Sequence, residues 1–425
     1  MLKLIKEKLR SGMGKDVVWT FSLQILIMLC SFTINKLLAS RLSIDDFGQY
    51  NVIKRSVQVL SFVMLAGVGI ALPRYIPLYR NGTPPRRIAP LLSAAFIYII
   101  GVTVIVSLVC ITFSSKMQDI IIGQSDDKVL LLVALAYAFI LAMAQYVFAY
   151  YRGIGDFKWY NGTQLTMQLA IIVPLILLPI LTVSRVFLSW LLLTTLLVAY
   201  LAGRELWHYI GRGGSFLLKS SLKPHLVTIV KYSSGRLVAD FFQFSLAAFP
   251  LIYISNVQGL QTTAYFSVGI TFITMITPLF SFMGIILLPY ISQAIARHEM
   301  KAANRLILRL SLIYVGAALL FITILYLFTD SLTTLLFASD YVAATDLTRI
   351  MILAILPQAA YMLYRNTIDA VSVIPYNAII LGLCLIAMVV CFMFSSTITH
   401  YAWAYLVVST IQGLLSWLIW IFLKK

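Results

Sequence analysis

Residues 89–113 read APLLSAAFIYIIGVTVIVSLVCITF, a run of 25 residues without a charged side chain. A helix needs about 20 consecutive apolar residues to cross the hydrocarbon layer of a membrane. This stretch therefore predicts a membrane-spanning helix. Similar runs recur along the whole chain, and their recurrence decides the fold class.

The composition agrees with that prediction. The chain has 425 residues, of which 61% are hydrophobic and 11% are charged, and its mean hydropathy is +0.95. Soluble domains average about 45–50% apolar and about 25% charged residues. Too little polar surface remains to cover a water-soluble globule, so the composition excludes a soluble enzyme, a secreted domain and a disordered scaffold. We predict an all-α integral membrane protein.

Breaking the sequence at charge clusters and at Gly/Pro turns predicts twelve spans. They are 17–38, 53–73, 89–113, 129–151, 164–183, 186–204, 232–254, 262–291, 306–328, 346–364, 375–395 and 401–423. The first run is longer than the roughly 7–15 residues of a signal-peptide core, so we expect it to be retained. The fifth and sixth spans are separated only around Ser184–Arg185.

Lysine and arginine set the orientation. With the N-terminus inside, the cytoplasmic segments hold 23 of these residues and the outside connections hold 5. The positive-inside rule then places both termini in the cytoplasm of a multi-pass plasma-membrane protein. The net charge of +17 is explained by contact with anionic membrane lipid, and no nucleic-acid partner is expected.

The longest connection between spans divides the chain. We predict an N-terminal lobe of six helices at residues 1–210, a cytoplasmic linker at 211–231 and a C-terminal lobe of six helices at 232–425. An internal repeat supports the division, since Tyr151-Arg152 and Asp156 match Tyr364-Arg365 and Asp369 at an offset of 213 residues. Parallel lobes of this kind usually enclose a central cavity, as in transporters.

Three motifs carry a family resemblance. Residues 42–50, LSIDDFGQY, follow the first span, and Tyr151-Arg152-Gly153 follows the fourth. Residues 337–341, FASDY, precede the tenth, with Ala338 where glycine is usual. In order and position they resemble the polysaccharide transporter branch of the multidrug/oligosaccharidyl-lipid/polysaccharide (MOP) exporters, which includes Wzx-type O-antigen flippases.

The resemblance implies a MOP-type fold of twelve helices and a function without covalent chemistry. It implies that the protein moves polyprenyl-pyrophosphate-linked oligosaccharide to the outer leaflet for surface polysaccharide such as O-antigen, capsule or exopolysaccharide. A polysaccharide polymerase and chain-length proteins are further candidate partners. No catalytic residue, metal site or cofactor is expected.

Charged residues within spans are costly, and they are therefore candidates for function. On the seventh span, Arg236, Asp240 and Gln243 share one helix face. Arg236 is a candidate pyrophosphate ligand, since its fork of donors fits phosphate oxygens, and Asp240 is a candidate orienting or coupling carboxylate. The alternative is that Arg236 extends to the cytosol and pairs with Asp240.

Further candidates lie on other spans. Lys36, Lys54 and Arg55 are candidate pyrophosphate ligands near the outer ends of the first two spans, or they interact with headgroups or with nearby acids. The candidate sugar-contacting amides are Gln243, Gln58, Gln145 and Gln24, and bonding between helices is the competing account. The repeated pairs Arg152/Asp156 and Arg365/Asp369 are expected to fix loops rather than to bind substrate, and the alternative is that Arg152 and Arg365 guide an anionic headgroup into the cavity.

Three other functions compete with flipping of an oligosaccharide. A cation-coupled drug antiporter of the MATE type needs several intramembrane carboxylates, and Asp240 is the one deep acid. A glycan polymerase or ligase needs acids or histidines on a sizeable outer loop, and the predicted outer loops are short. A lipid II flippase is a closer alternative, although such proteins usually have more helices.

Overall fold

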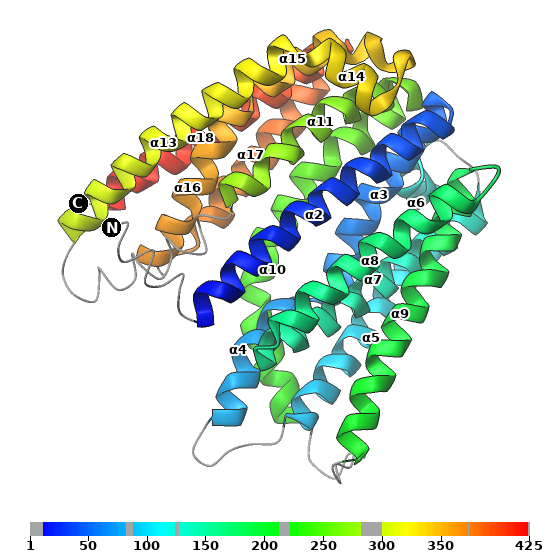
Figure 1. The fold of residues 1–425 in the computed structure, drawn as a ribbon, viewed down its shortest axis with the longest axis vertical. Helices are drawn as coiled ribbons and strands as arrows, with labels where there is room; N and C mark the ends of the chain where they lie inside the picture. Colours follow the sequence, from blue (N-terminus) through cyan, green and yellow to red (C-terminus); the bar gives the residue numbers. More distant parts are fainter. Residues whose placement is uncertain are drawn as a thin grey trace. The chain divides into compact units, whose positions relative to one another are not determined.

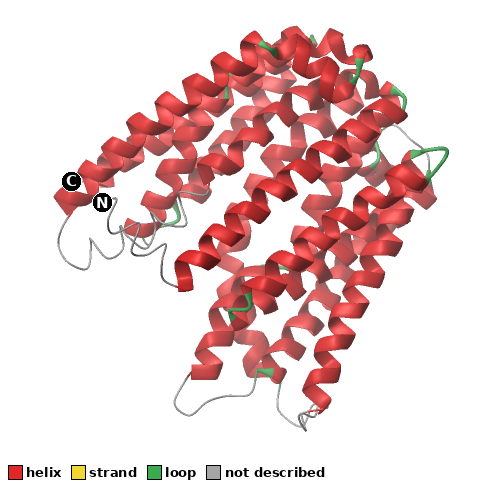
Figure 2. Ribbon diagram, in the orientation of Figure 1, coloured by secondary structure: helices red, strands yellow, loops and turns green. Residues whose placement is uncertain are grey.

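The computed structural model of the chain describes residues 12–81, 88–123, 127–211, 222–281, 300–372 and 374–423. Every regular element in these ranges is a helix, and no strand occurs among them (Figures 1 and 2). The all-α prediction is confirmed. Each of the twelve predicted spans overlaps a helix or a pair of helices, although the last ten residues of the eighth span lie outside the described ranges.

The helices form two compact units. Unit 1 contains Met1–Leu42 and Ile53–Leu237, and unit 2 contains Ser43–Val52 and Val238–Lys425. Two helices, α3 (Ile44–Leu65) and α10 (Lys223–Val257), each contribute residues to both units. The predicted division into lobes at 1–210 and 232–425 remains a prediction.

Unit 1 is built around α7, which packs against α4 and α9, while α8 packs against α2 and α9. A buried cluster of Val147, Tyr151 and Leu201 joins α7 to α9. Besides parts of α3 and α10, the unit contains α2 (Gly12–Arg41), α4 (Val68–Asn81), α5 (Ala89–Thr112), α6 (Ser114–Ile121), α7 (Lys128–Ile154), α8 (Phe157–Leu177) and α9 (Val183–Gly211).

Unit 2 is built around α16 and α18, which pack along each other, while α17 covers α18 and α13 covers α16. Besides parts of α3 and α10, it contains α11 (Leu260–Ser281), α13 (Met300–Leu327), α14 (Thr329–Phe337), η1 (Ser339–Ala344), α15 (Thr345–Ile352), α16 (Ile355–Val371), α17 (Tyr376–Met393) and α18 (Ile398–Leu423).

Eight of the described helices are long and apolar enough to cross a membrane, or nine if one bent pair counts as a single span. In that pair, Ser339–Ile352 and Ile355–Asp369 meet at 45°. Pro357 has no N–H to donate to the carbonyl of Leu353, and its ring crowds the preceding turn, which favours a bend there. The bend is therefore encoded by a single residue in the first turn of α16.

The predicted start of the second span is wrong. We predict a span from residue 53, with residues 42–50 as an outer connection, but α3 begins at Ile44. Ser43 Oγ accepts a hydrogen bond from the backbone N–H of Asp46 at 3.1 Å, which caps the helix. Asp45 and Asp46 then lie in the first turn, where the helix dipole favours negative charge.

The boundary between the fifth and sixth spans is also displaced. Helix α8 ends at Leu177 and α9 begins at Val183, so Ser184 and Arg185 lie in the first turn of α9. Leu178 has an extended backbone, with ψ of 125°, as expected for a residue that precedes a proline. Pro179 therefore ends α8, and charge is a poorer guide to this boundary than proline.

A buried aromatic cluster fills the core of unit 2 and unites two of the motifs. The ring of Phe47, on α3, lies 5.4 Å from that of Tyr341 and 6.2 Å from that of Phe337. All three side chains are at most 1% exposed. A Cβ atom at Gly48 would overlap the carbonyl oxygen of Leu260, so glycine lets α3 approach α11 this closely. The motifs at residues 42–50 and 337–341 therefore pack against each other in the core.

Ala338 adopts a backbone conformation that is nearly restricted to glycine, with φ of 85° and ψ of 169°. Such strain costs about 1–3 kcal/mol. We predict that Ala338→Gly stabilises the protein by about 1 kcal/mol, since the added chain entropy of glycine offsets part of the gain.

A thermal unfolding midpoint measured in detergent tests this prediction, with Ala359→Gly as the matched control. Ala359 lies inside α16 and is 1% exposed, so glycine there should lower the midpoint. A lower midpoint for both variants would contradict the assignment of strain to Ala338.

Candidate functional site

A polar network joins α10 to α16 within unit 2. Arg365 Nη1 donates a hydrogen bond to Gln243 Oε1 at 2.5 Å. Arg365 Nη2 lies 3.7 Å from Asp240 Oδ1, which makes an ion pair. The side chains of Arg365 and Asp240 are 28% and 22% exposed, so the pair is half-buried. One guanidinium therefore contacts two of the predicted site residues.

A second layer of hydrogen bonds fixes the backbone behind this network. Asn377 Nδ2, at the start of α17, lies 2.9 Å from the carbonyl oxygen of Arg365 and 2.7 Å from Asp369 Oδ1. Tyr364 Oη forms a hydrogen bond with Ser311 Oγ of α13 at 3.0 Å. The helix turn that carries Arg365 is thus held from two sides.

The repeated residues do not pair within each repeat, because each has another partner, although Arg152 and Asp156 do have the structural role expected of them. Arg365 contacts α10, whereas Asp369 accepts a hydrogen bond from Asn377. Arg152 Nη2 donates to the carbonyl oxygen of Gly69 at 2.6 Å. Asp156 Oδ1 accepts from the backbone N–H of Trp159 and caps α8. Residues at matching positions of the internal repeat therefore make different contacts in the two units.

Arg152, in the Tyr151-Arg152-Gly153 motif of unit 1, has a structural role. Helices α3 and α4 are separated by a bend at Ala66 and Gly67, whose φ angles are positive, at 51° and 75°. Gly69 lies in the first turn of α4, directly after this bend. A hydrogen bond from Arg152 to Gly69 therefore ties α7 to this bend. Substitution of Gly67 would strain the bend, and a Cβ there would also press against Ser233.

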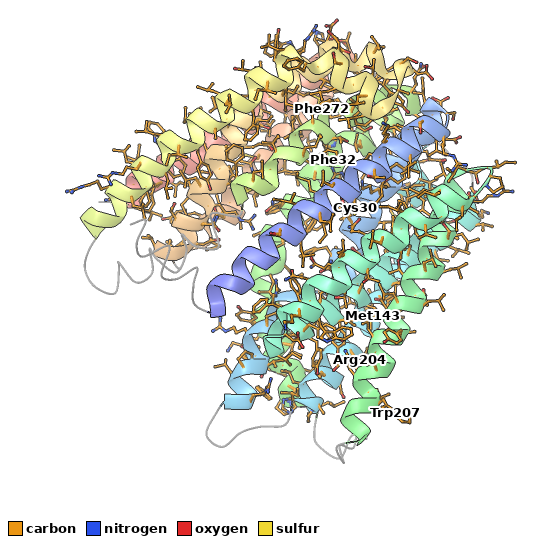
Figure 3. The ribbon with its side chains drawn as sticks, viewed as in Figure 1. Cys30, Phe32, Met143, Arg204, Trp207 and Phe272 are labelled. Atoms are coloured by element: carbon orange, nitrogen blue, oxygen red, sulfur yellow. The ribbon has the colours of Figure 1, made fainter. Side chains whose placement is uncertain are left out.

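The same end of α7 carries a further polar cluster. Tyr151 Oη and Tyr150 Oη donate to the two oxygens of Glu205 at 2.9 and 3.2 Å. Arg204 pairs with Glu205 at 3.0 Å and lies 3.6 Å from the centre of the Trp159 ring. Figure 3 labels Arg204 near Trp207 on α9. These contacts anchor α9 to α7 and α8.

The other predicted site residues lie mainly in unit 1. Arg55 donates to Gln58 Oε1 at 3.3 Å on α3, and Lys54 lies beside them, half-buried. Lys36 on α2 and Gln145 on α7 are exposed. The side chains of two more candidates, Arg236 on α10 and Gln24 on α2, lie outside the described part of the structure.

The span boundaries predicted from the sequence place Arg365 wrongly. The predicted span ends at residue 364, which places Arg365 just outside the membrane, but α16 continues to Val371. Arg365 therefore lies nearly two turns inside the helix. Charged residues within membrane-spanning helices usually pair with one another or with backbone carbonyls. Asp240 is the charged partner here.

Comparisons with known proteins identify relatives. Residues 13–293 match the model of a family described as polysaccharide biosynthesis protein. A comparison with curated proteins finds no match. Among solved structures, the chain resembles an inward-facing multidrug resistance MATE family transporter of the MOP superfamily, with 11% identity over 96% of this chain and 97% of that chain and a TM-score of 0.75.

Two further structures are similar. The lipid II flippase MurJ in an inward closed conformation is 12% identical over 95% of this chain and 87% of that chain, with a TM-score of 0.72. A MOP superfamily transporter from Pyrococcus furiosus is 15% identical over 98% of both chains, with a TM-score of 0.63. Identities this low establish the fold and nothing more. The MOP-type fold predicted from the sequence is confirmed.

The contact between Asp240 and Arg365 predicts non-additive effects on stability. Asp240→Asn and Arg365→Gln should each destabilise the protein by about 1 kcal/mol, between the values for exposed and for buried ion pairs. The double variant should lose less than the sum of the two, since the contact between Asp240 and Arg365 can be lost only once. Chemical unfolding of the four proteins in detergent measures the coupling, and strictly additive losses would refute it.

Proposed function

Because the chain belongs to the polysaccharide biosynthesis protein family, we propose that it is a flippase. It moves oligosaccharide units linked to polyprenyl pyrophosphate from the cytoplasmic to the outer leaflet of the plasma membrane, by alternating access. The reaction requires no covalent chemistry, so the protein acts as a transporter and not as an enzyme.

The observation that carries the proposal is a guanidinium within an apolar helix whose side chain is only partly covered by the protein. Arg365 lies inside α16 and its side chain is 28% exposed. Arginine binds phosphate oxygens through two parallel hydrogen bonds, which suits a pyrophosphate headgroup. Asp240 on α10 already has a cationic partner, whereas a cationic drug would need an available carboxylate. The charge of the network therefore favours an anionic substrate.

The remaining candidates retain their proposed roles. Arg236, Arg55, Lys54 and Lys36 bind the pyrophosphate, and the amides of Gln243, Gln58, Gln145 and Gln24 contact sugar hydroxyls. Asp240 either orients the pyrophosphate or couples transport to an ion. Both termini lie in the cytoplasm, and the basic residues there contact anionic lipid. A polysaccharide polymerase and chain-length proteins receive the product outside.

The sidedness of lipid-linked oligosaccharide tests this function. In cells that lack the protein, unpolymerised units should accumulate on the cytoplasmic leaflet, and the wild-type gene should relieve the accumulation. Arg236→Ala should fail to relieve it if Arg236 binds pyrophosphate, whereas full relief would limit that residue to contact with headgroups. No accumulation in the deletion strain would refute the proposal, and assays of drug efflux and lipid II transport would follow.

The role of Asp240 gives a separate prediction. If the carboxylate couples transport to a proton or sodium ion, Asp240→Asn should reduce the initial rate of transport at least tenfold while the protein remains in the membrane. Proteoliposomes with an imposed ion gradient and, separately, an imposed membrane potential measure that rate. A variant that transports normally under both conditions would show that the membrane potential alone drives export.

A further inference from the structure

We propose that Asp240 and Gln243 are internal competitors of the substrate for Arg365. In the structure they occupy the two terminal nitrogens of its guanidinium, and the diphosphate of the substrate takes their place when it binds. This inference rests on the proposed function, and it assigns to Arg365 an anion-binding role.

The geometry of the guanidinium supports the competition. Arg365 Nη1 is bonded to Gln243 and Arg365 Nη2 faces Asp240, so both arms of the fork are engaged. The same two arms would form the parallel hydrogen bonds that arginine makes to phosphate. Arginine has five N–H donors, but an anion that binds where Gln243 and Asp240 now contact the guanidinium must displace at least one of these α10 side chains.

The contact with Asp240 is suited to exchange. At 3.7 Å, the Nη2–Oδ1 distance exceeds that of a good charge-assisted hydrogen bond, which is about 2.7–2.9 Å. Both side chains are also partly exposed, at 28% and 22%. A partly exposed ion pair contributes little to stability, so a diphosphate, which carries two negative charges in total, can replace Asp240 as the partner of Arg365.

The backbone behind Arg365 stays in place during such an exchange. Asn377 holds the carbonyl oxygen of Arg365, and Tyr364 is bonded to Ser311. Only the long side chain needs to move, while α16 remains packed on α13 and α18. The backbone of Arg365 is thus held in place while its guanidinium can change partners, which suits a site that binds an anion reversibly.

Binding of farnesyl diphosphate to the purified protein in detergent tests the proposal, with affinity measured by isothermal titration calorimetry. Asp240→Asn should bind about 3- to 10-fold more tightly than the wild type, because the competitor has lost its charge. Gln243→Leu should show a smaller gain in affinity. Arg365→Gln should bind at least tenfold more weakly.

Two controls separate competition from a general effect of charge. Asp330→Asn removes the carboxylate of another Arg–Asp pair of unit 2, in which Asp330 Oδ2 lies 2.8 Å from Arg349 Nη2, and should leave the affinity unchanged. The double variant Asp240→Asn/Arg365→Gln should lose the gain of the single variant. If the gain persists without Arg365, the proposal is overturned.

Other outcomes are equally decisive. Equal or weaker binding by Asp240→Asn and Gln243→Leu, when both are folded as judged by their unfolding midpoints, would overturn the competition and leave the flippase function intact. Absence of binding by all variants would also overturn the proposal. The sidedness of lipid-linked oligosaccharide in cells would then still decide the proposed function, since it does not depend on this probe.

Discussion

The constraint on which the structure depends is the absence of water in the hydrocarbon layer. Each backbone N–H and C=O must find its partner within the protein, so an apolar segment of this length folds as a helix. At several helix ends a side chain supplies the hydrogen bonds that the helix itself cannot make. Ser43 caps α3, Asp127 caps α7, and Arg41 donates to the last carbonyl oxygens of α8.

The same constraint governs the charges. A guanidinium within an apolar helix is retained only with partners, and Arg365 has them on α10. These partners compensate the charge of the guanidinium. Elsewhere, arginines join helices through several kinds of partner. Arg204 pairs with Glu205, Arg152 donates to the carbonyl oxygen of Gly69, and Arg74 lies 4.5 Å from the centre of the Tyr232 ring.

Much of the fold follows from the sequence because hydropathy reports burial in lipid directly. The positions of the helices were predictable, and so was the shared face of Asp240 and Gln243. The predicted start of α3 is too late because Asp45 and Asp46 indicate a loop, whereas Ser43 caps a helix that includes both acids. The spacing Ser43-x-x-Asp46 is itself typical of a helix start. The partner of Asp240 was missed because Arg365 is 125 positions away along the chain, and contacts between distant helices depend on packing that no local pattern encodes.

The segment Ser43–Val52 has a consequence for biosynthesis. It belongs to unit 2, whose other residues begin at Val238, and Phe47 packs against aromatic rings about 290 positions further along the chain. At the usual ribosomal speed of roughly 5–20 residues per second, Phe47 waits about 15–60 seconds for them. Throughout that interval an early-made aromatic surface depends on lipid or on a chaperone, and a separately expressed C-terminal half lacks part of its own core.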